Sequence, residues 1–263
     1  MTPVVVIMGA SGGLGSAIAR EYLAQGARVV LAGRSIERLT RAAAGLSGNY
    51  SLLAADMADQ ASLQQAASQC LAQFGRVDVL VNAVGHDVRR ALDAHTDADI
   101  EMLVQTNLVS AIWLTRAFLP MLLAQGDGVI VHLGGFADGR LMFPYYTVDA
   151  ATRAGLRGFV DAVNREIEDS GVTVSYFSPA PADTDAERPY HPIWREMGTA
   201  IVPTEQVARA VVRAARRRER VHVMGAAARW FARLNSAAPG LADCLLMRRY
   251  GAVLKRHFGQ PLR

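Results

Sequence analysis

The chain has 263 residues, of which 51% are hydrophobic, and a formal net charge of +4. The apolar content is ample for a packed globular core, and so modest a charge gives no ground to expect a nucleic-acid partner. Two cysteines are too few for a disulfide framework and indicate a reducing cytosol. With no basic region before the first apolar run, and no run near the ~18 residues of a membrane span, we expect a cytoplasmic protein.

Short apolar runs alternate along the chain with longer amphipathic, alanine-rich stretches. Continuous apolar strands separated by helices are typical of a parallel sheet buried on both faces, and right-handed crossovers then give a Rossmann-type doubly wound α/β fold. Long helical stretches at 96–125 and 146–169 should flank the ligand crevice, and the proline-rich segment 178–192 should form a loop in the position of a lid. The seven expected strands cover residues 4–8, 29–32, 51–54, 77–81, 129–133, 172–177 and 221–224.

We expect one Rossmann-type domain over residues 1–225 and a basic amphipathic helical extension over residues 226–263, with its two helices separated at Pro239 and Gly240. The extension contains seven basic residues and one acidic residue, Asp243, so its formal charge is +6 and that of the remaining chain is −2. Such a segment is compatible with a solvated helix face packed on the domain. It is also compatible with contact to a membrane surface or with capture of a lipophilic substrate.

The turn after the first strand contains Gly9, Gly13 and Gly15 at the spacing Gly-x-x-x-Gly-x-Gly. Glycine permits the tight turn, lets backbone N–H groups approach a pyrophosphate, and allows the next helix to pack close to the sheet. The N-terminus of that helix can then hold the phosphate charge. The pattern therefore predicts a dinucleotide site, to which Ser11 and Leu14 also contribute.

Together with this turn, several segments resemble the short-chain dehydrogenase/reductase family over roughly residues 3–225. IMGASGGLG is similar to the family's glycine motif, with Met8 in place of a threonine, and VDVLVNAVG is similar to its Asn-Asn-Ala-Gly segment. The proline and threonine of the family's Pro-Gly-x-x-x-Thr stretch are also present, with Ala180 in place of its glycine. The resemblance implies further cofactor contacts by Asp56, Met57, Asn82, Gly85, Pro179 and Thr184.

Arg34, just past the second strand, bears on the choice of cofactor. An acidic residue at this place would bind a ribose 2′-hydroxyl, whereas arginine can hold a 2′-phosphate and stack on adenine. No second basic residue stands in the glycine turn, where Gly12 lies. We therefore predict that NADP(H) is preferred over NAD(H).

The family reduces carbonyls with a serine, a tyrosine and a lysine beside an asparagine, which Asn107 matches here. The segment VIVHLGGFADG places Gly135 at the serine position, and DAATRAGLRGF places Asp149 at the tyrosine position and Arg153 at the lysine position. No shift of the alignment restores the lysine, because Lys255 is the only lysine in the chain. The usual catalytic residues are therefore absent.

Asp149 then allows three interpretations: a general base, an acid if burial raises its pKa, or a structural ion pair with Arg153 one helical turn away. Tyr145 or Tyr146 could supply a replacement hydroxyl, although packing is the commoner role of such residues. His132 is expected to be a satisfied core histidine and Asp87 a turn residue. No spacing of histidines and cysteines predicts a metal site.

Two functions remain open. The first is an NADP(H)-binding enzyme with a non-standard active site, which acts on a small organic substrate by hydride transfer or by a non-redox step such as isomerisation, elimination or cyclisation. The alternative is a non-catalytic nucleotide-binding protein that serves as a scaffold partner of an active relative. In either case the resemblance implies a homodimer or homotetramer formed through the two long helices beside the crevice.

Overall fold

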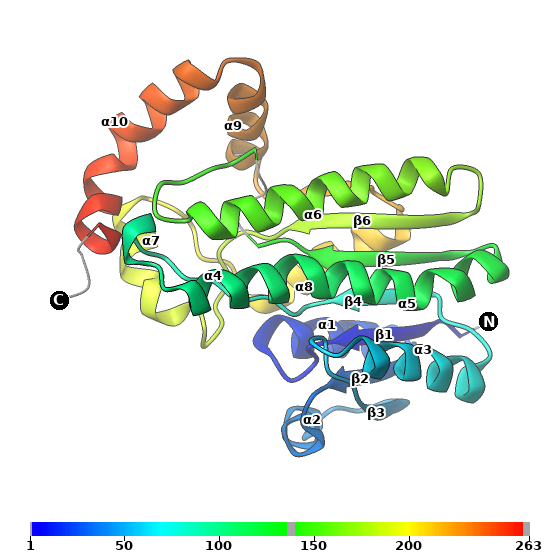
Figure 1. Ribbon diagram of the computed structural model, residues 1–263. Coiled ribbons are helices and arrows are strands. Elements are labelled where there is room, and N and C mark those ends of the chain that lie inside the picture. Colours follow the sequence, from blue (N-terminus) through cyan, green and yellow to red (C-terminus); the bar gives the residue numbers. More distant parts are fainter. Residues whose placement is uncertain (1, 136–139, 260–263) are drawn as a thin grey trace.

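The computed structural model describes residues 2–135 and 140–259, and its centre is a seven-stranded parallel sheet with the strand order β3-β2-β1-β4-β5-β6-β7 (Figure 1). The order reverses direction between β1 and β4, which is where Rossmann-type folds bind their ligands. The predicted fold and all predicted strands are confirmed, with bounds that differ by at most two residues. The strands are β1 (Val4–Met8), β2 (Arg28–Gly33), β3 (Tyr50–Ala54), β4 (Val79–Asn82), β5 (Gly128–Leu133), β6 (Val172–Ser178) and β7 (Val221–Val223).

Helices cover both faces of the sheet because successive strand residues point to opposite sides. Val5 and Ile7 of β1 enter the core under one layer of helices, and Val6 and Met8 enter the core under the other. The first layer consists of α1 (Gly13–Ala24), α2 (Ile36–Ala43) and α8 (Thr204–Arg216). The second consists of α3 (Gln60–Phe74), α5 (Ser110–Gln125) and α6 (Thr147–Glu166).

The helix expected over residues 96–125 is interrupted by a π-helical turn, Gln105–Val109, between α4 (Asp97–Val104) and α5. Thr96 begins α4 with a capping box, in which its side chain and that of Asp99 each accept a hydrogen bond from the other's backbone N–H. By length and composition, Asp97–Gln125 is long and apolar enough to cross a membrane. In this fold α5 belongs to the second helical layer, since Leu114, Phe118 and Leu122 are fully buried against the sheet.

The sequence predicts a loop over residues 178–192, but the segment after β6 is not wholly a loop. It contains a 3-10 turn, Arg188–Tyr190, and α7 (His191–Glu196), whose second residue is Pro192. Proline is accepted there because the first helical N–H groups have no partner within the helix. A further 3-10 turn, Leu92–Ala94, follows β4.

The extension forms α9 (Ala226–Ala237) and α10 (Pro239–Phe258), with the break where Pro239 and Gly240 predict it. Figure 1 shows α10 leaving the far end of α9 and returning along the edge of the molecule to α7. Its side chains Leu246, Leu254 and Phe258 share a third core with Trp194 of α7 and Tyr146. The extension therefore packs on the loops at the carboxyl edge of the sheet; its separation as a domain at residue 226 stays a prediction.

Candidate active site

The glycine turn between β1 and α1 is packed as closely as a dinucleotide site requires. Gly9 has a φ of 80°, and a Cβ on it would lie 2.9 Å from the Val84 side chain. A Cβ on Gly15 would lie 2.3 Å from the Gly9 carbonyl oxygen, so glycine is needed for α1 to begin this close to the strand. Gly12 precedes α1 without a side-chain capping bond, which leaves the helix N-terminus for an anion. The residues present fit a pyrophosphate.

The predicted contacts to the phosphates and the nicotinamide end meet at this turn. Ser11, Gly13 and Leu14 lie in the turn or at the start of α1, and none of them is buried. Thr184 comes from the segment after β6, and a Cβ on Gly13 would lie 2.8 Å from its methyl carbon. Pro179 is buried directly after β6. Two segments far apart in sequence are thus adjacent where the resemblance expects the cofactor.

The residues predicted for the adenosine end follow the neighbouring strands β2 and β3. Arg34 is exposed immediately after β2, and the next residue, Ser35, caps α2 through a hydrogen bond from the Arg38 N–H. Asp56 follows β3, and its carboxylate accepts the Ala58 N–H at 3.0 Å, while Met57 is buried. Arg34 and Asp56 therefore lie at the same edge of the sheet as the glycine turn, as an adenosine site requires.

Asn82 is buried at the end of β4, within a chain of polar contacts. Its side-chain nitrogen lies 3.2 Å from Nδ1 of His132, whose Nε2 lies 2.8 Å from the Thr115 hydroxyl. The Asn82 oxygen accepts the Val84 N–H at 3.1 Å, which holds the loop after β4. Burial lowers the pKa of His132 to about 4, so this ring is neutral. His132 is the hydrogen-bonded core residue that its position predicts.

Asn107, Asp149 and Arg153 lie together, as the aligned positions predict. Asn107 sits in the π-helical turn and joins the loop after β4 through two bonds to the His86 backbone, of 2.9 and 2.8 Å. Its amide nitrogen lies 3.3 Å from the Asp149 carboxylate, which also accepts Nε–H of Arg153 at 3.0 Å. The Asp149 and Arg153 side chains are 3% and 4% exposed, so this ion pair is almost fully buried.

Glycine at the serine position leaves the space that the Arg153 guanidinium occupies. A Cβ on Gly135 would lie 3.1 Å from Nε of Arg153, and a Cβ on Gly85 would lie 3.1 Å from one of its terminal nitrogens. The guanidinium is therefore held between the ends of β4 and β5, where the family's serine side chain would project. Two of the replacements seen in the sequence, at positions 135 and 153, thus fit each other in space.

Asp87 and Arg89 also belong to the cluster, and the sequence interpretation of Asp87 as a turn residue missed this. An oxygen of Asp87 lies 3.5 Å from Arg153 and the other accepts a 3.0 Å bond from Arg89. Arg89, 3% exposed, also forms a two-pronged ion pair with Glu187 at 2.9 and 2.7 Å. Its guanidinium lies 3.8 Å from the centre of the Tyr190 ring. The only signal in the sequence is a run of charges in an otherwise apolar loop.

The pKa values of the two carboxyl groups shift in opposite directions because Asp87 faces two arginines and Asp149 faces one. Burial, together with the neighbouring Asp87 carboxylate, raises the pKa of Asp149 to about 7 despite the opposing effect of Arg153. Burial acts in the same direction on Asp87, but Arg153 and Arg89 outweigh it and hold its pKa below the usual range. A proton shared by the pair therefore resides on Asp149 near neutral pH.

The two candidate tyrosines lie on different sides. Tyr145, with a φ of 71°, directs its hydroxyl toward the end of α10, where a Cβ on Gly259 would lie 2.9 Å away. Tyr146 is 2% exposed and packs against Trp194 and Phe258. Within the described part of the chain its buried hydroxyl has no hydrogen-bond partner, and burial raises its pKa. Tyr146 is therefore the tyrosine that has a free hydroxyl near the cluster.

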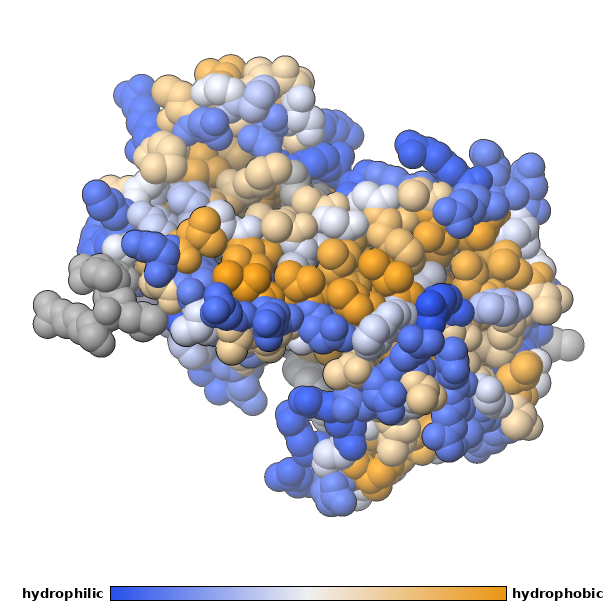
Figure 2. Space-filling view, viewed as in Figure 1, coloured by the Kyte–Doolittle hydropathy of each residue, from blue (hydrophilic) through white to orange (hydrophobic). Residues whose placement is uncertain are grey.

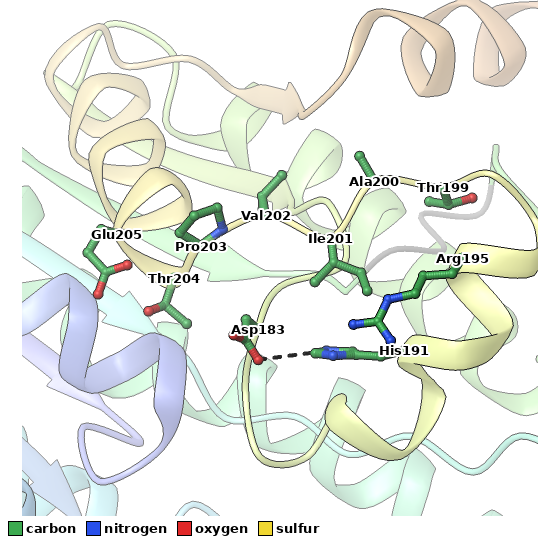
Figure 3. A pocket seen from close by; sticks show the side chains of 10 residues that line it. All are labelled: Asp183, His191, Arg195, Thr199, Ala200, Ile201, Val202, Pro203, Thr204 and Glu205. Atoms are coloured by element: carbon green, nitrogen blue, oxygen red, sulfur yellow. Dashed lines mark ion pairs between the residues drawn. The ribbon is translucent and has the colours of Figure 1, made fainter.

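Two hollows flank the segment 199–202. The more polar one, of about 590 Å³, lies between α7 and the start of α8 (Figure 3). In it His191 faces Asp183 across 3.9 Å, and Glu205 points toward α1. The larger one, of about 950 Å³, is mainly apolar and lies under α9 and α10. Neither Asp149 nor Arg153 lines either hollow. Among the described residues, no group of three or more acidic, histidine or cysteine side chains is arranged to hold a metal ion.

Comparison with known proteins agrees with this geometry. A family model described as short chain dehydrogenase matches residues 3–192. A curated relative from Bos taurus, dehydrogenase/reductase SDR family member 7B, is 33% identical over 186 residues, which cover 67% of this chain and 57% of the relative. The 2,3-dihydroxy-2,3-dihydro-p-cumate dehydrogenase of Pseudomonas putida is 31% identical, with coverage of 69% and 71%. The matched part is thus little more than half the length of the bovine relative.

Two solved structures have the same fold. A short-chain dehydrogenase from Streptomyces avermitilis is 25% identical, covers 95% of this chain and 98% of its own, and has a TM-score of 0.79. A metagenomic short-chain oxidoreductase in complex with NADP is 29% identical, with coverage of 81% and 90% and a TM-score of 0.68.

Proposed function

Because the chain belongs to the short-chain dehydrogenase/reductase family, whose members bind nicotinamide dinucleotides, we propose that it is an NADP(H)-dependent oxidoreductase that interconverts a carbonyl and an alcohol. The observation that carries the proposal is the buried Asp149–Arg153 pair, with the half-buried Asp87 beside it, next to Gly85 and Gly135. Reduction of a carbonyl requires a proton donor and a group that stabilises negative charge on the oxygen. A carboxyl group that can hold a proton, next to a fixed cation, offers both.

NADPH, when bound, would supply the hydride that a carbonyl carbon accepts, and the substrate oxygen would then carry negative charge. Arg153 stabilises that charge from the place where the family's serine would project. Asp149 donates its proton to the oxygen, and the product is the alcohol. Asp87 stays ionised and holds Arg153; with 34% of its side chain exposed, it also connects Asp149 to solvent for reprotonation. In the reverse direction the Asp149 carboxylate accepts the alcohol proton.

The preference for NADP(H) rests on Arg34. Its exposed guanidinium follows β2 at the edge that carries the glycine turn, where a 2′-phosphate would lie. The similarity to a short-chain oxidoreductase described as a complex with NADP supports the same cofactor.

The pH profile tests the proton assignment. Reduction needs protonated Asp149, so kcat/KM for reduction should be constant below a pH of about 7 and fall about tenfold per unit above it. Alcohol oxidation needs the Asp149 carboxylate, so kcat/KM for oxidation should fall below a pH of about 7 and be constant above it. Asp149→Asn should remove turnover in both directions, whereas Asp161→Asn, a matched change of a 40% exposed carboxylate on α6, should leave it unchanged.

Turnover retained in Asp149→Asn would contradict the role of this carboxyl group. Binding of dinucleotide without turnover of any ketone or alcohol, in either direction, would instead favour the non-catalytic scaffold.

A homodimer or homotetramer is part of the proposal. Figure 2 shows apolar side chains gathered in a band over α5 and α6, on the face turned away from the sheet. Partly buried residues of these helices and of the preceding π-helical turn include Leu108, Trp113, Leu119, Met121 and Phe159. An apolar band of this kind is typically covered by a second copy. Light scattering after size exclusion should find at least a dimer, and a strict monomer would refute this part. The cytoplasmic location stays a prediction.

A further inference from the structure

The apolar cavity of about 950 Å³ joins the helical extension to the rest of the molecule. Its volume lies within the roughly 300–1,000 Å³ typical of sites for organic ligands. The walls come from the segment before α6, the loops after β6 and β7, and both helices of the extension. Apolar side chains that line it include Leu141, Phe143, Met224, Phe231, Leu246 and Tyr250.

The part of this cavity at the loop after β6, here called its inner end, is linked to the reaction cluster through a hydrogen bond. Ala180 and Pro181 line it, and they follow Ser178, whose hydroxyl donates to the Gly135 carbonyl at 3.1 Å. Gly135 is in turn the residue against which the Arg153 guanidinium packs. A molecule in the cavity would thus have one end at the loop where the resemblance places the nicotinamide.

The outer rim is cationic. Arg248 and Arg249 of α10 both line the cavity and are exposed. Neither forms an ion pair with a carboxylate in the described residues, whereas Arg256 on the same helix pairs with Glu196 at 3.0 Å. None of the described residues that line the cavity is acidic. The charge of the rim is therefore available to an anion.

We propose that this cavity binds the aliphatic chain of an anionic amphiphile, with its carboxylate or other anionic group at Arg248 and Arg249. An oxo or hydroxyl group farther along the chain would then lie at the inner end, near Ala180. The assignment names the substrate class of the proposed oxidoreductase and rests on that function for the reaction, but not for binding.

Calorimetric titration without cofactor tests the binding. Decanoate should bind with a negative heat-capacity change, and each methylene added from hexanoate to decanoate should tighten binding by up to about fourfold. Decyltrimethylammonium should bind at least tenfold more weakly than decanoate. All probes are kept below the concentration at which they form micelles. Equal affinity for the anionic and cationic probes would overturn the assignment of the rim.

Matched variants separate the rim from the general charge of the extension. Arg248→Gln with Arg249→Gln should weaken decanoate binding about tenfold. Arg233→Gln removes the same kind of charge from α9 at an exposed position that does not line the cavity, and should leave binding unchanged. An equal loss in the two cases would show that the amphiphile responds only to overall charge, and would overturn the site.

A second pair separates the cavity from surface adsorption. Leu245 lines the cavity and is 41% exposed, while Leu241 is 53% exposed on the same helix and does not line it. Leu245→Glu should weaken decanoate binding at least tenfold and Leu241→Glu should not. Equal losses would mean that the apolar surface of α10 adsorbs the probe as it would a membrane, which contradicts an internal site. These readouts need no turnover. Decanoate binding by a protein without oxidoreductase activity would therefore refute only the oxidoreductase proposal and leave the binding site standing.

Discussion

Restoring the family's serine at position 135 should not restore the family's chemistry, because Arg153 occupies the space. Gly135 has a φ of 75°, and a Cβ there would lie 3.1 Å from Nε and 3.3 Å from Cζ of Arg153. The left-handed backbone alone costs a residue with a side chain about 1–2 kcal/mol. Pushing the guanidinium from its 3.0 Å bond with Asp149 adds part of the roughly 3–5 kcal/mol that loss of a partner costs a buried ion pair.

A loss of about 3 kcal/mol is therefore expected for Gly135→Ser, which corresponds to a Tm lower by roughly 6–12 °C in a chain of this size. Thermal unfolding measures it, and Gly135→Ala serves as control because it introduces the same backbone strain and the same Cβ without the hydroxyl. Combining Gly135→Ser with Arg153→Lys should recover part of the loss, since the slimmer ammonium leaves room for the hydroxyl. An unchanged Tm together with faster ketone reduction in Gly135→Ser would refute the packing argument.

Three further predictions concern the cofactor and the ion pairs. Arg34→Ala should weaken NADPH binding at least tenfold in a fluorescence titration and leave NADH binding nearly unchanged; parallel losses would refute the 2′-phosphate contact. Gly15→Ala should abolish dinucleotide binding, because the added carbon meets the Gly9 carbonyl, whereas Gly158→Ala, which faces open space, should not. Glu187→Gln should lower the free energy of unfolding by about 3 kcal/mol, because it weakens the pairing of the buried Arg89; a change below about 0.5 kcal/mol would show that Asp87 suffices for this cation.

The sequence predicted those features that depend on local pattern. The apolar runs predicted every strand of the sheet, and the spacing of Gly9, Gly13 and Gly15 predicted the turn. Both patterns depend only on residues that are neighbours in sequence. The break at Pro239 followed from the missing proline N–H in the same way.

Features that depend on the meeting of distant segments were not predictable in this way. The sequence predicts only a turn at Asp87. In the fold Asp87 lies beside Arg153, which comes 66 residues later, after the neighbouring strand β5. The raised pKa of Asp149 depends on that encounter and on burial, neither of which has a sequence signature. The π-helical turn contains Asn107, whose two bonds go to the His86 backbone, 21 residues earlier and on the loop after β4.

The replacements at positions 135, 149 and 153 are best understood as one rearrangement. A guanidinium is larger than an ammonium and needs the volume that Gly135 leaves free. A neutral tyrosine at position 149 would not balance the guanidinium charge, whereas a carboxyl group there forms the buried pair at 3.0 Å. Asp87 then adds a second carboxylate, so that one proton remains to be shared instead of a permanently ionised pair. A structural ion pair would need only the first carboxylate. In the proposed reaction, burial of Asp149 and the second carboxylate together keep a proton on Asp149 near neutral pH.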